Sequence, residues 1–254
     1  MAVYNMIFSP TGGTKKVAEL FATAFTDTYT TIDLTNYQED YTAYSFEEDD
    51  VCIVSVPSFA GRVPLTAVER IEKMHGNKAK AILIAVYGNR EYEDTLVEMQ
   101  DVLSGAGFIP VAAVAALAEH SIIRTFAKGR PDKNDEQILA DFAKQITKKI
   151  NESDSMEELN LPGDRPYRAR APLASKPLLK DSCVKCGLCV KACPVQAIPA
   201  DLSKSMDEDV CISCMRCETV CPIKAREVAP QVTAFLNEML SVSAKGYKEN
   251  QLFL

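Results

Sequence analysis

The sequence predicts an α/β protein in which a doubly wound parallel sheet precedes a small cysteine-rich α+β domain. Three observations lead to this prediction. Apolar runs alternate with helical periodicity over residues 1–150, a polar and proline-rich stretch follows, and eight of the nine cysteines then lie between residues 183 and 221. A chain of 254 residues is comfortable for two domains, and its hydrophobic fraction of 47% is sufficient for a sizeable core.

Five segments in the first part have the length and composition of buried strands. They span residues 3–9, 29–34, 51–56, 81–87 and 108–117. The last of these is rich in alanine and is therefore also compatible with a helix. Helical periodicity separates the strands, at residues 14–24, 65–74, 95–103 and 136–150. This alternation indicates a parallel sheet covered on both faces, and the right-handed crossover rule favours a doubly wound domain.

The expected domain boundaries follow from changes in composition. Residues 1–150 form the α/β domain. Residues 151–175 contain N-E-S-D-S and several prolines and are interpreted as a linker, with a long surface loop as the alternative. Residues 176–230 form the cysteine-rich domain, which is built from an internal repeat. Residues 231–254 are expected to form a short amphipathic helix and a polar tail.

Composition and the N-terminal sequence limit the location and the partners. The net charge of −7 argues against nucleic acid as the main partner. The first ten residues lack the basic region and cleavage site of a signal peptide, and the longest apolar run is about half the ~20 residues that a membrane helix needs. We therefore expect a cytoplasmic protein without a membrane span, in which the cysteines are metal ligands rather than disulfides.

The cysteines form two similar runs, C-V-K-C-G-L-C-V-K-A-C-P at residues 183–194 and C-I-S-C-M-R-C-E-T-V-C-P at residues 211–222. The spacing C-x2-C-x2-C-x3-C-P is typical of [4Fe-4S] proteins in which three cysteines of a run bind one cluster and the fourth binds the other. It predicts one cluster held by Cys183, Cys186, Cys189 and Cys221, and a second held by Cys193, Cys211, Cys214 and Cys217. Zinc is the alternative, but zinc sites usually combine two separated C-x2-C pairs.

Three loops at strand ends form a candidate site for a flat, phosphorylated cofactor. The first, S-P-T-G-G-T at residues 9–14, opens a helix and offers hydroxyl and N–H donors to a phosphate, although a simple capping turn is the alternative. The other two, P-S-F-A-G-R-V-P at residues 57–64 and Y-G-N-R-E-Y at residues 87–92, each contain an aromatic residue, a glycine and an arginine. In a doubly wound sheet such loops share one edge, where two aromatic rings can enclose a flat ring.

These loops resemble the FMN site of flavodoxins, and the resemblance covers roughly residues 1–150. It implies strand order 2-1-3-4-5, and it places Phe59 and Tyr92 on opposite faces of the flavin. The residues expected to contact FMN are Ser9, Thr11, Gly12, Gly13, Thr14, Ser58, Phe59, Gly61, Arg62, Tyr87, Gly88, Asn89, Arg90 and Tyr92. The cysteine runs resemble bacterial two-cluster ferredoxins, and the whole chain is similar to flavodoxin–ferredoxin fusion proteins of anaerobic bacteria and archaea.

The chain departs from flavodoxins in the charges near the expected flavin. Flavodoxins keep acidic residues there, whereas this chain has Lys15 after the first loop and Arg62 and Arg90 in the other two. We expect cations close to the ring to favour the negatively charged, two-electron-reduced flavin.

Several other residues have simpler expectations. Cys52 lies within the third strand and is expected to be a small core residue rather than a reactive thiol. His75 is expected at the surface. His120 follows the fifth strand and is expected to be a solvated loop residue, with a flavin or substrate contact as the alternative. The linker arginines are expected to be solvated, with attachment to the acidic α/β domain as the alternative: Arg165, Arg168 and Arg170.

The whole pattern predicts an electron-transfer protein with FMN and two [4Fe-4S] clusters. Such a chain would pass electrons between the clusters and FMN and couple one-electron to two-electron carriers, with redox proteins such as ferredoxin as partners. An FMN-dependent reductase of a small organic acceptor such as a quinone, fed through the clusters, is the alternative. A sensory or structural role for the clusters is the third interpretation. No residue is assigned a catalytic role, because no nucleophile–base pair has a helpful spacing.

Overall fold

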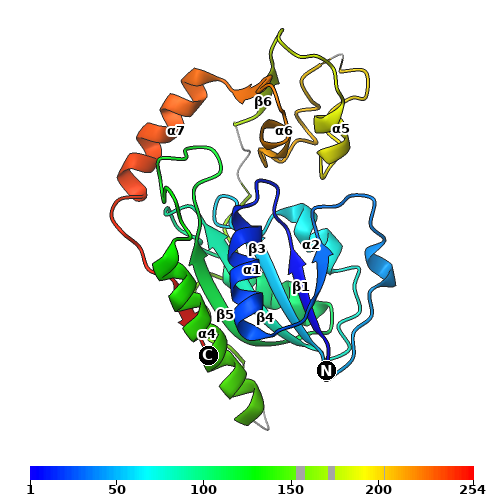
Figure 1. Ribbon diagram of the computed structural model, residues 1–254, viewed down its shortest axis with the longest axis vertical. Coiled ribbons are helices and arrows are strands. Elements are labelled where there is room, and N and C mark those ends of the chain that lie inside the picture. The colour runs from blue at the N-terminus through cyan, green and yellow to red at the C-terminus, as the bar shows by residue number, and fades with distance from the viewer. Residues whose placement is uncertain (153–157, 171–174, 203) are drawn as a thin grey trace.

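The computed structural model describes residues 1–152, 158–170, 175–202 and 204–254. The chain forms an α/β domain, and a smaller cysteine-rich part lies beyond the edge at which the parallel strands end (Figure 1). A long C-terminal helix runs beside both parts and leads back to the α/β domain. Within the described ranges, no helix combines the length and the apolar character that crossing a membrane requires.

The central sheet contains six strands in the order β2-β1-β3-β4-β5-β8. They are β1 (Val3–Ile7), β2 (Thr30–Asp33), β3 (Val51–Pro57), β4 (Lys80–Tyr87), β5 (Ile109–Leu117) and β8 (Gln251–Phe253). The first five are parallel, whereas β8 pairs with β5 in the antiparallel direction. The expected doubly wound sheet with order 2-1-3-4-5 is confirmed, and the alanine-rich fifth segment is a strand.

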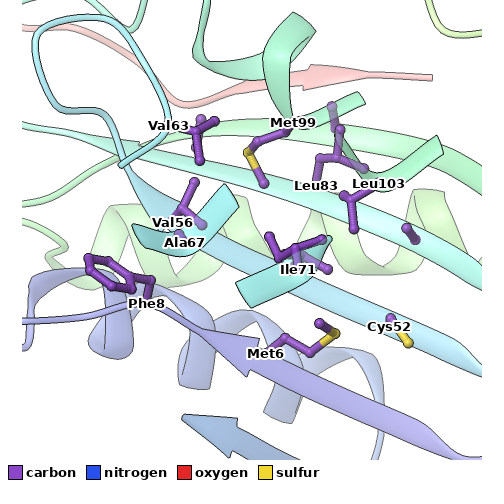
Figure 2. Close-up of a cluster of buried hydrophobic side chains, with 14 of the residues drawn as sticks. Met6, Phe8, Cys52, Val56, Val63, Ala67, Ile71, Leu83, Met99 and Leu103 are labelled. Carbon is purple, nitrogen blue, oxygen red and sulfur yellow. The ribbon is translucent and has the colours of Figure 1, made fainter. Parts of the chain in front are cut away.

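Helices cover both faces of the sheet and create two buried clusters. One face carries α1 (Gly13–Phe25) and α4 (Lys133–Glu152), and the other carries α2 (Leu65–Ile71) and α3 (Thr95–Gly105), with a short 3-10 helix at Tyr41–Ala43. Figure 2 shows part of the buried cluster under α2 and α3, where Ile71 of α2 and Met99 of α3 pack over the sheet.

Strand β3 shows why the central strands are apolar throughout. Its Cys52 and Val54 belong to the cluster under α2 and α3, whereas Val51 and Ile53 belong to the cluster under α1 and α4. Successive side chains of a strand point to opposite faces, so a strand covered on both sides has no solvated face. Cys52 is fully buried, as expected for a core residue, and burial raises the pKa of its thiol.

The C-terminal segment contains more structure than the expected helix and polar tail. Helix α7 (Pro230–Ser243) is present, but residues 251–253 then form β8 at the edge of the sheet. Asn250 positions this strand, because its Oδ1 accepts a hydrogen bond from Leu117 N at 2.9 Å. The polar-tail expectation is therefore wrong for these residues. A three-residue strand that pairs its backbone with the exposed edge of β5 needs no long apolar run in the sequence.

The described part of the expected linker, residues 158–170, packs against the α/β domain. Leu159 and Leu161 belong to the buried cluster under α2 and α3. Three arginines pair with acidic residues of α3 and the loop before it: Arg165 with Asp101, Arg168 with Glu93 and Arg170 with Glu98. All three arginines remain exposed, so they are solvated as expected and also make the alternative attachment to the α/β domain. Residues 153–157 and 171–174 of the expected linker lie outside the described residues.

The described residues of the cysteine-rich part form two short strands and two short helices. They are β6 (Pro177–Leu179), α5 (Leu188–Ala192), α6 (Arg216–Thr219) and β7 (Arg226–Val228), with β6 and β7 antiparallel. The sequence repeat extends to the backbone, because Lys185 and Gly187 have positive φ, as do the equivalent residues Ser213 and Met215. In both runs the helix begins directly after the second of these residues.

Candidate functional site

A cavity with an empty volume of about 690 Å³ lies at the edge where the parallel strands end. It lies near the switch point between β1 and β3, the place where doubly wound sheets bind ligands. Loops after β1, β3, β4 and β5 line this loop cavity. The lining residues from these loops are Pro10, Thr11, Gly13, Thr14, Pro57, Ser58, Phe59, Ala60, Val86, Tyr87, Gly88, Arg90, Glu91, Ala118, Glu119, His120 and Ser121.

The first loop leads into the N-terminus of α1, where backbone N–H groups favour an anion. Gly12 has a φ of 93°, which strongly favours glycine. The Oγ of Ser9 accepts a hydrogen bond from Lys15 N at 2.9 Å, so this hydroxyl holds the turn. Ser9 and Gly12 thus shape the loop. The other expected residues of the loop line the cavity: Thr11, Gly13 and Thr14.

The second loop is a tight turn that presents Phe59. Phe59 N donates to Arg62 O at 2.9 Å, and Arg62 N donates to Phe59 O at 3.2 Å. The two residues between them, Ala60 and Gly61, both have positive φ, which is the geometry of a type I′ turn. A Cβ on Gly61 would lie 2.0 Å from Glu93 Oε2, so glycine is also required for space. Ser58 and Phe59 line the loop cavity, whereas Gly61 shapes the turn.

Some residues of the third loop line the cavity, whereas others lie outside it and hold the loop in place. Three of the expected residues line the cavity: Tyr87, Gly88 and Arg90. Asn89 turns away, and its Nδ2 donates to Ala244 O at 2.7 Å, just beyond α7. Tyr92 packs behind Tyr87, with ring centroids 5.2 Å apart, and its hydroxyl donates to Gln251 of β8. The structure therefore does not bring Tyr92 to the wall, because packing against β8 orients its ring.

The three cations do not gather around the loop cavity. Arg62 is buried outside it and donates to Glu98 from Nε at 2.7 Å and from Nη2 at 2.8 Å. Lys15 is exposed and lies 3.6 Å from Glu19. Arg90 does line the cavity, but both of its terminal nitrogens bond to Glu93. The expectation that Arg62 acts on the flavin as a free charge is wrong in this geometry.

His120 has a fixed protonation state at the wall of the cavity. Burial lowers the pKa of its imidazole to about 4, and the Arg90 guanidinium acts in the same direction. The Nδ1 accepts hydrogen bonds from Ile122 N at 3.2 Å and Ile123 N at 3.0 Å, which fixes the proton on Nε2. The expected solvated loop histidine is therefore wrong. His120 is instead a partly buried, neutral imidazole that lines the loop cavity.

Two smaller cavities in the cysteine-rich part each collect one of the two predicted ligand sets. The first cysteine cavity is lined by Cys183, Cys186, Cys189 and Cys221. The second cysteine cavity is lined by Cys193, Cys211, Cys214 and Cys217. All eight are free thiols. Ala197 N donates to Cys193 Sγ at 3.3 Å, and the repeat-related Ala225 N donates to Cys221 Sγ at 3.1 Å. Thiolates that bind iron accept such bonds, so the residues present fit a pair of clusters.

Residues 182–225 match the 4Fe-4S dicluster domain family. The preceding sheet has the 2-1-3-4-5 strand order of flavodoxin-like domains. The chain is therefore a fusion of a doubly wound α/β domain with a segment that matches the 4Fe-4S dicluster family. Its combination of domains supports an electron-transfer or oxidoreductase role. A comparison with curated proteins finds no significant match to the sequence of the fusion.

Several solved structures are similar to part of the fusion. A flavodoxin from Streptococcus pneumoniae TIGR4 is 17% identical, with a TM-score of 0.42, and the match covers 58% of this chain and 99% of that one. A flavodoxin from Archaea is 14% identical, with a TM-score of 0.41 and coverage of 59% and 99%. An azoreductase from Bacillus anthracis str. Sterne is 12% identical, with a TM-score of 0.37 and coverage of 58% and 100%.

In the fusion, the dicluster domain closes one side of the loop cavity. Cys214 lines both the second cysteine cavity and the loop cavity. Two arginines hold the domains together here. Arg216 Nη1 donates to Pro10 O at 3.1 Å, and Arg70 Nη2 donates to Pro194 O at 2.6 Å. The second cysteine cavity therefore lies directly against the loop cavity.

Sequence reasoning missed part of this site. The loop after β5 supplies Ala118, Glu119 and Ser121 to the wall, and the rule that ligands bind beyond strand ends could have found them. No sequence pattern around Cys214 indicates its contact with the loop cavity, because this contact depends on how the two domains dock. The same holds for Arg70, whose partner Pro194 lies in the other domain.

Proposed function

We propose that the fusion is an electron-transfer protein that binds FMN in the loop cavity and one [4Fe-4S] cluster in each cysteine cavity. The observation that carries this proposal is the position of Cys214, a ligand of the second cluster that also lines the loop cavity. A cluster held there is next to the flavin, with no further domain motion needed for electrons to pass. FMN exchanges one or two electrons when bound, and each cluster exchanges one.

The loop cavity has separate regions for the parts of FMN. The phosphate belongs at the N-terminus of α1, beside Thr11, Gly13 and Thr14. Phe59 flanks the isoalloxazine ring, and Tyr87 is held on the third loop by Tyr92 behind it. His120 offers its neutral N–H to the ring. The dicluster domain excludes water from the side at Cys214.

The first cysteine cavity is the side at which an external redox protein exchanges electrons. Cys186 is exposed there, unlike the buried Cys189 and Cys193. Three apolar side chains that line the same cavity are also exposed: Val184, Leu188 and Ile223. A small apolar patch around a cluster suits a weak, transient interface with a protein carrier. Electrons then pass between the surface, the first cluster, the second cluster and FMN.

The proposal is tested by anaerobic purification, analysis of iron, sulfide and flavin, and rapid mixing with a reduced ferredoxin. We expect about eight iron atoms and one FMN per chain, and flavin reduction after cluster reduction. A preparation without flavin would refute the proposal. A preparation with flavin that stays oxidised while the clusters are reduced would favour the sensory or structural role instead.

A second candidate function is the reduction of a small organic acceptor. A cavity with an empty volume of about 1010 Å³ adjoins the loop cavity, and the two share Phe59, Arg90 and His120. Its far wall is an apolar side of α7, formed by Leu236, Met239 and Leu240. This space is open to a quinone-sized molecule. Oxidation of the reduced protein by an added quinone, blocked by Leu240→Trp, would favour the reductase; equal rates in both proteins would count against it.

A further inference from the structure

Two arginines of the dicluster domain have buried guanidinium nitrogens without hydrogen-bond partners. These atoms are Nε of Arg216 and Nε and Nη2 of Arg226. Across the described residues, only two other buried side-chain atoms lack a partner, Asn5 Oδ1 and Ser55 Oγ. An unpaired guanidinium N–H inside a protein is costly, so three of them in one small domain call for a physical reason.

The internal repeat places each of these arginines at a position where the other repeat has an apolar residue. Aligning the two cysteine runs pairs Arg216 with Leu188 and Arg226 with Ile198. Repeat-related residues line the two cysteine cavities, so each cavity has an apolar residue at one of these positions and an arginine at the other. The first cavity contains Leu188 and Arg226, and the second contains Ile198 and Arg216. The sequence thus supplies one arginine to each cavity, through different positions of the repeat.

Arg226 lies almost entirely out of contact with water. Its exposed fraction is 1%, and its Nη1 donates a hydrogen bond to Ser205 O at 2.6 Å. No ion pair of Arg226 occurs within the described part of the chain. A guanidinium is always charged in proteins, so this site holds a buried positive charge without a carboxylate. Such a charge is strongly unfavourable unless an anion occupies the neighbouring space.

Arg216 also has a buried guanidinium nitrogen without a partner, and it contacts the α/β domain as well. Its Nη1 donates to Pro10 O in the first loop at 3.1 Å, whereas its Nε is buried and has no partner. The residue lines the second cysteine cavity. Its guanidinium therefore lies between this cavity and the phosphate-binding end of the loop cavity.

We propose that Arg226 and Arg216 donate hydrogen bonds to the sulfurs of the first and the second cluster, respectively, and raise the reduction potential of each. This inference rests on the proposed pair of clusters. A cluster held by four thiolates is an anion, and its sulfide and thiolate sulfurs accept hydrogen bonds. It would therefore supply both the negative charge and the acceptors that the unpaired guanidinium nitrogens lack. Each added electron makes it more negative, so a fixed cation and N–H donors stabilise the reduced form more than the oxidised form.

Three substitutions test this, each taken from the equivalent position of the other repeat. R226I and R216L replace the arginines by the residues of the sister positions, Ile198 and Leu188. K224Q is the matched control, because Lys224 is exposed and its sister position holds Gln196. Each protein is purified anaerobically, its iron is counted, and both clusters are titrated with a low-potential one-electron donor under spectroscopic observation.

We expect each arginine variant to make reduction of one cluster at least tenfold less favourable, a fall of about 59 mV for one electron. R226I should lower mainly the potential of the first cluster and, because the Arg226 charge also acts on Cys211 and Cys217, that of the second to a smaller extent. R216L should lower the potential of the second cluster, and the double variant should lower both. K224Q should leave both unchanged, because an exposed charge is screened by water. If R226I loses iron, R226Q, which keeps N–H donors without the charge, is titrated instead and should show a smaller fall.

Two results would overturn the inference: unmoved potentials in arginine variants that keep their iron, or an equal fall in K224Q. Failure of the proposed function gives a different result, because wild-type protein would then contain no cluster pair to titrate. Resonance Raman spectra provide an independent readout. The Fe–S stretching bands of the wild type should shift in deuterated solvent more than those of the double variant, since fewer exchangeable N–H groups then contact the sulfurs.

Discussion

Phe59 is the residue whose side chain is best placed to contact a flat ring. It is half-buried on the 59–62 turn and lines both the loop cavity and the cavity beside α7. Phe59→Ala should weaken FMN binding by about tenfold, because aromatic stacking contributes about 1 kcal/mol beyond the buried area. Titration of the apoprotein with FMN, followed by flavin fluorescence, measures this.

Tyr92→Phe is the control for this prediction. The substitution removes only the hydroxyl that bonds Gln251 and leaves the ring behind Tyr87. FMN affinity should stay within about twofold of the wild type, since the side chain does not line the cavity. A loss in Tyr92→Phe as large as that in Phe59→Ala would show that Tyr92 reaches the flavin after all.

His120 should make the stability of the α/β domain depend on pH. Burial lowers the pKa of its imidazole to about 4 in the folded chain, from an ordinary value of 6.5. The unfolded chain therefore binds more protons between these values, and the free energy of unfolding falls as the pH falls through this range. The contribution is fully present above about pH 6.5, and we expect a loss of about 2 kcal/mol by about pH 4.5.

His120→Asn isolates this contribution, because the amide oxygen can accept the bonds from Ile122 N and Ile123 N without titrating. Urea unfolding of the holoprotein from about pH 7 to about pH 5 should show a smaller slope in the variant. His75→Asn serves as the control, since His75 is exposed. An unchanged slope in His120→Asn would contradict the assigned protonation state.

A buried polar residue, Asn250, precedes strand β8 and joins it to β5 and α4. Asn250 is 7% exposed, and its Nδ2 donates to Asp135 Oδ1 at 2.7 Å while its Oδ1 accepts from Leu117 N at 2.9 Å. Asn250→Leu keeps the branched shape of the side chain but leaves a buried N–H and a buried carboxylate without these partners. The free energy of unfolding should fall by about 2–3 kcal/mol in urea titrations. Glu249→Gln, at an exposed neighbour, should change it by less than about 0.5 kcal/mol.

The same strand shows which elements a sequence reveals. The five parallel strands are buried on both faces, so their apolar runs are visible in the sequence, and helices between them fix the topology. Strand β8 is three residues long within a polar tail, and no periodicity marks it. The loops of the site follow from the ends of those strands. The orientation of Tyr92 and the pairing of Arg62 with Glu98 do not, because both depend on tertiary packing.

At the scale of the whole molecule, the relation between the two domains decides how electrons can move. The dicluster domain lies beyond the edge of the sheet at which the loop cavity opens (Figure 1). Arg70 of α2 is 7% exposed and donates to Pro194 O at 2.6 Å, directly after Cys193, a proposed cluster ligand. It also bonds Leu34 O, at the end of β2. One buried side chain therefore ties the sheet edge to the second cysteine cavity.

Arg70→Met should slow electron transfer between the clusters and FMN by several-fold. The substitution keeps an unbranched apolar stem but removes both hydrogen bonds, so the distance between the proposed second cluster and the flavin is held less tightly. Flash reduction of the clusters, followed by flavin absorbance, measures the rate, and FMN affinity and iron content should match the wild type. Lys73→Met removes an exposed charge next to α2 and should keep the original rate. A wild-type rate in Arg70→Met would mean that other contacts suffice to dock the domains.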